Sequence, residues 1–270
     1  MSEAAVEEPA GTLVLAERRG GVLVLTLNRP ERLNAWNEEI EAAYFALLDE
    51  AEADPEVRAV VVTGAGRGFC AGADMEVLAQ VGGDVETEGI ASQRPRHRPL
   101  LFRKPLVAAL NGAAAGLGLV EALYCDVRFA TAEAKLTTSF ARRGLIAEYG
   151  IAWLLPRLVG QSRALDLLLS ARVVRGEEAL GMGLVDRVVG PEDLLEAAVA
   201  YAQDLAEACS PMSMAVIKSQ VLQALDTDFA TATSEAERQM LASFRRPDVV
   251  EGVASYLEGR PPVFEGLALD

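Results

Sequence analysis

Histidine is almost absent: the 270 residues include one, and this scarcity excludes whole classes of chemistry. A Ser-His-Asp or Cys-His triad has only His97 to use, and metal sites built from several histidines are impossible. The three cysteines, Cys70, Cys125 and Cys209, are an odd number without C-x-x-C spacing, so we interpret them as reduced packing residues. Catalysis must therefore rest on carboxylates, backbone groups or a cofactor.

Long apolar runs are also missing. No stretch reaches the roughly 20 residues that a membrane-spanning helix needs, and the start, MSEAAVEEPA, is acidic where a secretory signal is basic. Because 51% of the residues are hydrophobic, the chain can still bury a large core. We expect a globular cytoplasmic protein with no membrane partner.

Basic residues are few, at 25 Lys and Arg against 40 Asp and Glu, which gives a formal net charge of −15. A nucleic-acid partner is disfavoured, because neutralising phosphates requires a basic face. Cations gather in one segment, which we interpret as a solvated loop. The alternative is that this segment binds a phosphorylated ligand. The residues of this segment are Arg94, Arg96, His97, Arg98, Arg103 and Lys104.

Hydrophobic periodicity predicts an α/β protein. A hairpin of strands at residues 12–15 and 22–27 precedes an amphipathic helix at 36–53. Buried strands follow at 59–63, 105–110 and 127–130, and a helix at 117–124 lies between the last two. Helical periodicity then dominates at residues 194–208, 213–225, 229–244 and 249–257. We therefore divide the chain into an α/β core, residues 1–195, and a helical C-terminal region, residues 196–270.

Two glycine-rich turns directly follow predicted strands, at residues 64–74 and 111–118. Glycine permits close backbone approach, so both turns are able to present bare N–H groups to a ligand, and the second enters a helix. A dinucleotide-dependent enzyme is disfavoured, because Phe69-Cys70-Ala71-Gly72 interrupts the helix that a G-x-G-x-x-G loop must open. Each turn taken alone is more often structural than functional.

Five phrases occur in a fixed order: LNRPERLNAWN, FCAGAD, NGAAAGLG, CDVRFA and ALGMGLVD. With this series the chain resembles the crotonase (enoyl-CoA hydratase/isomerase) superfamily over nearly its whole length. The resemblance implies a spiral of repeated ββα units with a helical C-terminal trimerisation region, in a homotrimer or a dimer of trimers. It also implies an acyl-CoA thioester partner, with coenzyme A entering as part of the substrate and no separate cofactor or metal.

Carried over by position, the resemblance places two backbone donors for the thioester oxygen at Ala73 and Leu117. An amide aimed at an oxygen that becomes an enolate stabilises the transition state by about 3 kcal/mol. The further substrate contacts that it implies come from Arg32, the carbonyl of Ala35, Ala71, Asp74, Met75 and Gly116.

The acid/base residues distinguish the branches of this family. The two glutamate positions of hydratases hold Val120 and Phe140 here, so paired-glutamate hydration is put in doubt. Glu148, eight residues before Pro156, resembles the isomerase carboxylate, and Leu117 also resembles that branch. Glu121 is the weaker candidate, because one residue along a helix turns a side chain by about 100°.

We expect an isomerase-type enzyme in which Glu148 takes a proton from the carbon α to the carbonyl and returns it to the γ carbon. Val120, Phe140, Ile146 and Trp153 are expected to line the pocket and raise the pKa of Glu148 by desolvation. The alternatives are a hydratase in which Glu148 or Glu121 activates water, and a non-catalytic acyl-CoA-binding protein.

Overall fold

The computed structural model describes residues 11–80 and 95–267, and a six-stranded sheet forms its framework. In spatial order the strands are β1 (Val14–Arg19), β2 (Val22–Leu27), β3 (Ala59–Gly64), β5 (Leu106–Leu110), β7 (Val127–Thr131) and β10 (Arg187–Val189). β1 pairs antiparallel with β2, and the strands from β2 to β10 run parallel. Every residue of β3 and β5 is buried, as parallel strands covered on both faces require.

A smaller, four-stranded sheet consists of β4 (Gly68–Cys70), β6 (Ala113–Ala115), β8 (Lys135–Thr137) and β9 (Val174–Arg175). The two sheets are built by a repeat: β3, β4 and α2 (Met75–Gln80) form one ββα unit, and β5, β6 and α3 (Leu117–Tyr124) form the next. Each unit gives one strand to each sheet. The predicted α/β spiral of ββα units is confirmed.

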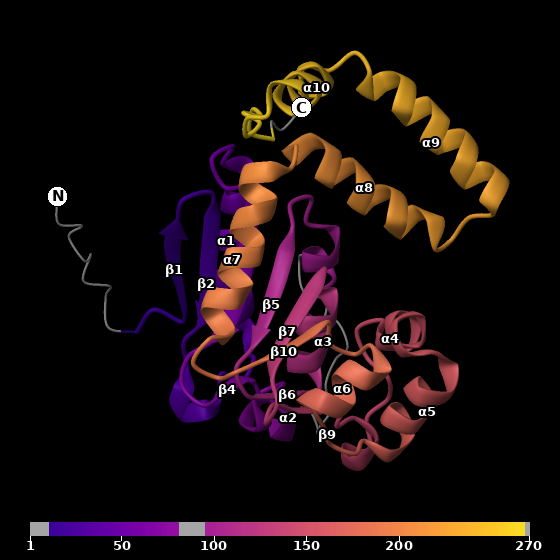
Figure 1. Ribbon diagram of the computed structural model, residues 1–270. Helices are drawn as coiled ribbons and strands as arrows, with labels where there is room; N and C mark the ends of the chain where they lie inside the picture. The colour runs from indigo at the N-terminus through magenta and orange to yellow at the C-terminus, as the bar shows by residue number, and fades with distance from the viewer. Residues whose placement is uncertain (1–10, 81–94, 268–270) are drawn as a thin grey trace, which may run out of the picture.

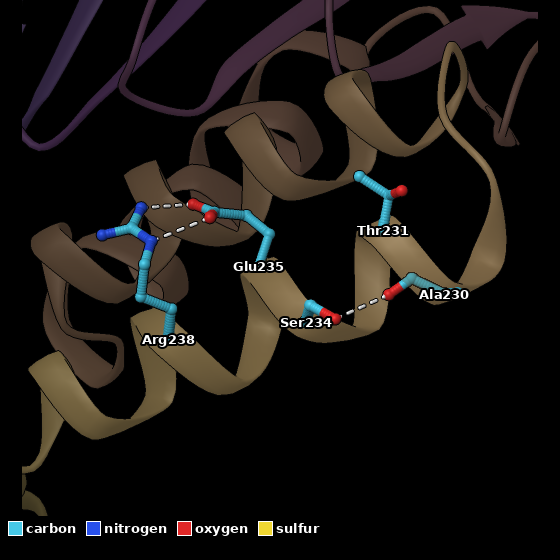
Figure 2. A pocket seen from close by; sticks show the side chains of 5 residues that line it. All are labelled: Ala230, Thr231, Ser234, Glu235 and Arg238. Carbon is cyan, nitrogen blue, oxygen red and sulfur yellow. Dashed lines mark hydrogen bonds and ion pairs between the residues drawn. The ribbon is translucent and has the colours of Figure 1, made fainter.

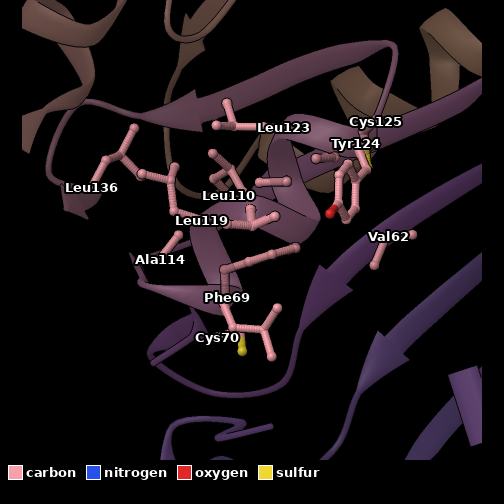
Figure 3. Close-up of a cluster of buried hydrophobic side chains, with 14 of the residues drawn as sticks. Val62, Phe69, Cys70, Leu110, Ala114, Leu119, Leu123, Tyr124, Cys125 and Leu136 are labelled. Atoms are coloured by element: carbon pink, nitrogen blue, oxygen red, sulfur yellow. The ribbon is translucent and has the colours of Figure 1, made fainter. Parts of the chain in front are cut away.

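The main core lies between the sheets and the helices α1 (Glu38–Ala53) and α3. The buried residues of α1, which include Ile40, Tyr44 and Leu48, recur at helical spacing, as the sequence predicts. Figure 3 shows how α3 side chains meet those of the neighbouring strands, with Phe69 and Leu110 among them. The core thus fixes α3 beside the ends of β4 and β6.

The opposite face of the large sheet is covered by α7 (Leu194–Ala208), which crosses it in Figure 1. Ala198, Val199 and Ala202 of α7 are buried in a second cluster with Val61 and Val107 of the sheet. The division expected between residues 195 and 196 therefore falls inside a helix that belongs with the sheet. The helices that leave the sheet begin at α8.

The remaining helices lie at two sides of the molecule. α4 (Ile151–Val159), α5 (Gln161–Ser170) and α6 (Gly176–Met182) follow β8 and flank β9, whereas α8 (Pro211–Ala224), α9 (Phe229–Ser243) and α10 (Pro247–Glu258) extend away from the sheet (Figure 1). α8 to α10 expose large apolar side chains, with Phe229 86% and Tyr256 85% accessible. Among the described residues, no helix combines the length and the apolar character that crossing a membrane takes.

The predicted long elements match the structure closely. β2, α3 and α7 have the predicted bounds, and α1 begins at Glu38 because the Asn37 side chain caps it by accepting from the Ile40 N–H at 2.9 Å. The strand predicted at 12–15 is wrong in extent, because hairpin pairing with β2 carries β1 to Arg19. The sequence did not predict the small sheet, whose strands are two or three residues long.

Candidate active site

The turn after β3 is fixed by a buried asparagine. The Asn34 side chain is completely buried, and its Nδ2 donates to the carbonyls of Gly68 at 2.8 Å and Phe69 at 3.1 Å. Its Oδ1 accepts from the Arg29 N–H at 2.8 Å. One side chain therefore ties the segment before α1 to β4, which leads into the predicted oxyanion loop at residues 71–74.

Gly72 brings this loop against the start of α3. Its φ of 93° lies in the region that favours glycine, and a Cβ there would come within 2.5 Å of the Ala115 carbonyl oxygen and 3.6 Å of the Leu117 nitrogen. The loop is held from its other side by Trp36, whose N–H donates to the Gly72 carbonyl at 2.8 Å and whose carbonyl accepts from the Asp74 N–H at 2.9 Å. Ala73 is thereby placed beside Leu117.

The amides of Ala73 and Leu117 are available to a ligand. Within residues 11–80 and 95–267, neither N–H donates to a protein acceptor. Leu117 is the first residue of α3, where N–H groups have no partner inside the helix and the helix dipole favours negative charge. The two predicted donors are brought together as an arrangement suited to a developing oxyanion.

Asp74 serves as an anchor of the loop. Its carboxylate accepts from the Glu76 N–H at 3.1 Å and from Arg29 Nη2 at 3.1 Å. These contacts, the Glu76 hydrogen bond first, lower the pKa of Asp74 below its ordinary value. The Ala71 N–H is also occupied, because it donates to the Leu33 carbonyl at 3.0 Å.

The other predicted substrate contacts lie around this loop. Arg32 is exposed and pairs with Glu76 at 2.9 Å, and the Ala35 carbonyl accepts from Arg29 Nη1 at 2.9 Å. Met75 is 57% exposed at the start of α2, and the Gly116 N–H donates to the Thr137 carbonyl at 3.0 Å. Arg29, which sequence reasoning did not single out, joins Ala35 to Asp74.

Glu148 lies in the loop that enters α4, and its carbonyl accepts from the Ile151 N–H at 3.1 Å. The next residue, Tyr149, has a φ of 54°, which a bulky residue keeps only where its surroundings impose it. The imposing contact comes from α3, because the Tyr124 hydroxyl donates to the Tyr149 carbonyl. Partial burial raises the pKa of Glu148 above its ordinary value, and the charge of Arg96 opposes this rise.

A cavity of about 360 Å³ adjoins this loop. Three aromatic side chains stand on its wall, those of Tyr124, Tyr149 and Trp153. The wall is completed by Arg96, His97, Leu100, Gly150 and Leu154. Of the four side chains predicted to line a pocket, Trp153 borders this cavity.

The other three predicted pocket residues lie elsewhere. Val120 and Phe140 are buried in the main core, where they pack without bordering the cavity. Ile146 is 79% exposed, so the prediction that it desolvates Glu148 is wrong for the single chain. Its loop turns outward after η4 (Ala141–Arg143), a short 3-10 helix that ends at Gly144. Burial of Glu148 comes from its other neighbours.

Glu121 points into the protein interior from α3. The residue is 4% exposed, and its Oε2 has no hydrogen-bond partner in the described structure. Burial first, and then the nearby Glu41 carboxylate, raise the pKa of Glu121 well above its ordinary value, whereas Arg96 opposes the rise. Burial of this carboxyl therefore disfavours its ionised form.

Among the described residues of the cation-rich segment, Arg96, Arg98 and Lys104 are held against α1 and its end, which differs from the solvated loop that we expected. Arg98 pairs with Asp49, at 3.0 Å, and with Glu52 of α1. Lys104 is buried, and its Nζ donates to the carbonyls at the end of α1, Ala51 at 2.7 Å and Asp54 at 2.6 Å. The Arg96 side chain also forms an ion pair with a carboxylate of α1. Arg94 lies outside the described residues.

A second hollow, along α9, is lined differently. Its five lining residues come from this one helix, and Figure 2 shows Glu235 and Arg238 paired with each other one turn apart. The Ser234 hydroxyl likewise donates to the Ala230 carbonyl at 3.0 Å. Because these polar groups satisfy one another, the hollow presents no converging chemistry.

Comparisons with known proteins show which family the chain resembles. Residues 17–267 match the family model described as Enoyl-CoA hydratase/isomerase. The 1,2-epoxyphenylacetyl-CoA isomerase of Escherichia coli (strain K12) is 37% identical over 261 residues, which cover 94% of this chain and 98% of that protein. The short-chain-enoyl-CoA hydratase of Clostridium acetobutylicum is 32% identical over 250 residues, covering 92% and 95%. The crystal structure of a probable enoyl-CoA hydratase/isomerase from Mycobacterium abscessus superposes with a TM-score of 0.88 at 30% identity, covering 94% of this chain and 99% of that one. The chain belongs to the enoyl-CoA hydratase/isomerase family, also called the crotonases.

Proposed function

We propose that this protein moves the double bond of an enoyl-CoA thioester, using Glu148 as its single base. The observations that carry the proposal are two amides, Ala73 and Leu117, without a protein acceptor among the described residues, and one partly buried carboxylate, Glu148, in the loop that enters α4. The two positions at which hydratases carry glutamates hold Val120 and Phe140, and both are buried in the core.

The two amides supply the electrostatic part of the reaction. A thioester oxygen that accepts from both N–H groups gains charge as the α proton leaves, so the hydrogen bonds strengthen toward the transition state. Each donor contributes on the order of 3 kcal/mol. The N-terminus of α3 adds a favourable dipole at the same oxygen.

Glu148 supplies the proton transfer. Its carboxylate takes the proton from the α carbon, and the electron pair of the broken C–H bond moves into the carbonyl to give an enolate. The Glu148 carboxylic acid then gives the proton to the γ carbon, whose new C–H bond takes the electrons of the β,γ double bond. The enolate electrons re-form the carbonyl and leave the double bond between the α and β carbons. No water is added, and no cofactor beyond the substrate's own coenzyme A is required.

The raised pKa of Glu148 suits this role. A base acts best when its pKa approaches the working pH, because it is then both deprotonated and strong enough to attract the proton. Burial moves Glu148 in that direction. We place the acyl group in the neighbouring cavity, where Tyr124, Tyr149 and Trp153 offer an apolar wall. Arg32 and the Ala35 carbonyl are the proposed contacts for the nucleotide part of coenzyme A.

Hydration of a 2-enoyl-CoA is the second candidate, and the hydratase among the relatives favours it. This reaction needs a carboxylate that orients water, and Glu121 is the further carboxyl on α3. Its burial, which disfavours the carboxylate form, and the lack of a partner for its Oε2 in the described structure argue against this role. A protein that binds acyl-CoA without turning it over is the alternative of another class.

Substitution of Glu148 by Gln separates these possibilities. We expect kcat for double-bond migration in a 3-enoyl-CoA to fall by about 100-fold or more, because the amide is not a base. Hydration of a 2-enoyl-CoA is measured beside it, and calorimetry reports acyl-CoA binding. Glu207→Gln, an exposed change on α7, is the control. Full migration activity in the Glu148 variant overturns the proposal, and binding without any turnover favours the non-catalytic alternative.

We also propose that the chain assembles through α8 to α10. Large apolar side chains on these helices are exposed in the single chain, and contiguous exposed apolar surface marks an interaction site. The residues concerned are Ile217, Val221, Phe229, Leu241, Phe244, Val250, Val253, Tyr256 and Leu257. A homotrimer or a dimer of trimers, as expected from the sequence, covers them.

A further inference from the structure

A chain of contacts connects the two halves of the candidate site. The Trp36 backbone pairs with Gly72 and Asp74 of the oxyanion loop, and its Nε1 donates to Glu41 Oε2 at 3.1 Å. The same carboxylate oxygen lies 3.5 Å from Arg96 Nη1. Glu41 therefore links the segment that holds the oxyanion loop to a cation from a distant part of the sequence.

Arg96 continues this chain to the base loop. Its Nη1 donates to the Tyr149 hydroxyl at 3.3 Å, and its guanidinium carbon lies 5.2 Å from the centre of the Tyr149 ring. Tyr149 directly follows Glu148 and is held in its left-handed conformation by Tyr124. Arg96 thus contacts the residue that directly follows Glu148.

The environment of Arg96 explains why it stays in place. Glu41 and Arg96 both have largely buried side chains, at 10% and 26% exposure, and an ion pair is screened less there than on the surface. An arginine that lies over an aromatic ring, donates to a hydroxyl and pairs with a carboxylate is fixed in more than one direction. Removal of either charge leaves the other buried without its partner.

We propose that Arg96 is a positioning residue, anchored by Glu41, that couples the oxyanion loop to the loop carrying Glu148. This inference rests on the proposed role of Glu148 as the base. Arg96 does not touch the reacting atoms in this scheme. It acts by holding Tyr149 and by presenting a positive charge to Glu148 across the cavity wall.

Several titratable groups face Arg96 and define its electrostatic effect. Glu41 approaches it from α1, Glu121 and Tyr124 from α3, and Glu148 and Tyr149 from the base loop. The positive charge lowers the pKa of Glu148, so its removal raises that pKa. Because the base must be deprotonated, the acid limb of kcat/KM then moves to higher pH.

Hydrogen exchange measured by mass spectrometry tests the coupling without relying on turnover. In Arg96→Gln we expect amides at residues 71–76 and at 145–150 to exchange about tenfold faster, since a hydrogen bond to a charged group is lost in the network that holds both loops. Arg98→Gln is the matched control: it also loses ion pairs to α1, but it has no contact with Tyr149. The control leaves both loops unchanged.

The pH profile provides the second readout. Arg96→Gln shifts the acid limb of kcat/KM on a 3-enoyl-CoA to higher pH and lowers kcat more than it raises KM, whereas Arg96→Lys, which keeps the charge, restores the limb. If Arg96→Gln is too unstable, the double variant Glu41→Gln with Arg96→Gln removes both buried charges and still shifts the limb. An unshifted limb in both variants, or faster exchange in one loop alone, overturns the proposal.

These measurements also separate this inference from the proposed function. Faster exchange of both loops in a protein that never moves the double bond preserves the coupling and removes the isomerase assignment. The opposite result is turnover that depends on Glu148 while Arg96→Gln changes neither the hydrogen exchange nor the pH profile. The function then stands and the positioning role of Arg96 falls.

Discussion

Burial decides the chemistry of Glu121, the single carboxylate of α3. The side chain packs among Tyr44, Tyr124 and Cys125 in the interior, and desolvation holds its pKa well above the ordinary value. A glutamate in this setting keeps its proton over a pH range in which the unfolded chain releases it. The folded protein therefore loses stability through this residue as the pH rises.

Replacement of Glu121 by Gln tests this residue-scale conclusion. Below the unfolded pKa of about 4.3 the wild type and the variant should respond to pH alike. As the pH rises from there toward the folded pKa of Glu121, the free energy of unfolding of the wild type falls by about 1.4 kcal/mol for each pH unit. The free energy of unfolding of the variant lacks this decrease. Urea denaturation at fixed protein concentration, with Glu207→Gln as control, measures the difference. A gap that stays constant with pH would falsify the neutral assignment.

At the scale of elements, the site depends on how closely β4 and the start of α3 approach. A Cβ on Gly118 would lie 2.2 Å from the Cys70 carbonyl oxygen, so the first turn of α3 rests directly on the end of β4. Gly72 makes the matching contact from the loop side, against Ala115. The spacing of the two donor amides is therefore set by backbone packing between consecutive ββα units.

Gly72→Ala should separate the two amides. The added methyl group meets the Ala115 carbonyl at 2.5 Å, so the loop must move, and we expect kcat to fall by about 100-fold because one oxyanion donor is displaced. Gly160→Ala is the control: its φ of 83° carries similar backbone strain, but nothing lies within 4 Å of the new methyl. Steady-state kinetics and thermal melting of both variants make the comparison. Equal losses in the two would assign the effect to strain alone.

At the scale of the whole molecule, the described residues form a packed α/β body and a helical extension, α8 to α10, that contacts the body through Lys218 but buries few side chains. α8 and α9 contact each other, but their buried residues are few: Pro211 on α8 and none on α9. Helices of this length owe most of their stability to packing of an apolar face. The extension therefore needs a second surface, which we assign to other copies of the chain.

Charge placed on the extension should break the assembly. Phe229→Glu together with Tyr256→Glu introduces two carboxylates at sites that we expect to be buried between subunits, where an unpaired charge is costly. Analytical ultracentrifugation should show a trimer or hexamer for the wild type and a monomer for the double variant. Glu133→Lys, in the exposed turn between β7 and β8, is the control that leaves assembly intact. An unchanged sedimentation coefficient in the double variant contradicts the assigned surface.

The sequence by itself determined the features that local pattern encodes. Single-histidine composition excluded metal sites built from several histidines and left only His97 for a triad, continuous apolar runs predicted β2, β3 and β5, and ordered motifs indicated the family. Motif position also predicted the donor amides and Glu148 as candidates. The strand and family predictions succeeded because strand periodicity and motif order are properties of neighbouring residues, whereas the roles of the donor amides and of Glu148 stay predictions.

The tertiary structure alone decided which side chains are buried and with whom they pair. Glu41, Arg96, Tyr124 and Tyr149 meet from four separate segments, and no local pattern distinguishes Arg96 from the exposed arginines of this chain. Ile146 was predicted inside and lies outside, because exposure depends on the elements that surround a loop and not on the residue's own hydrophobicity. The short strands of the second sheet are likewise set by pairing partners distant in sequence.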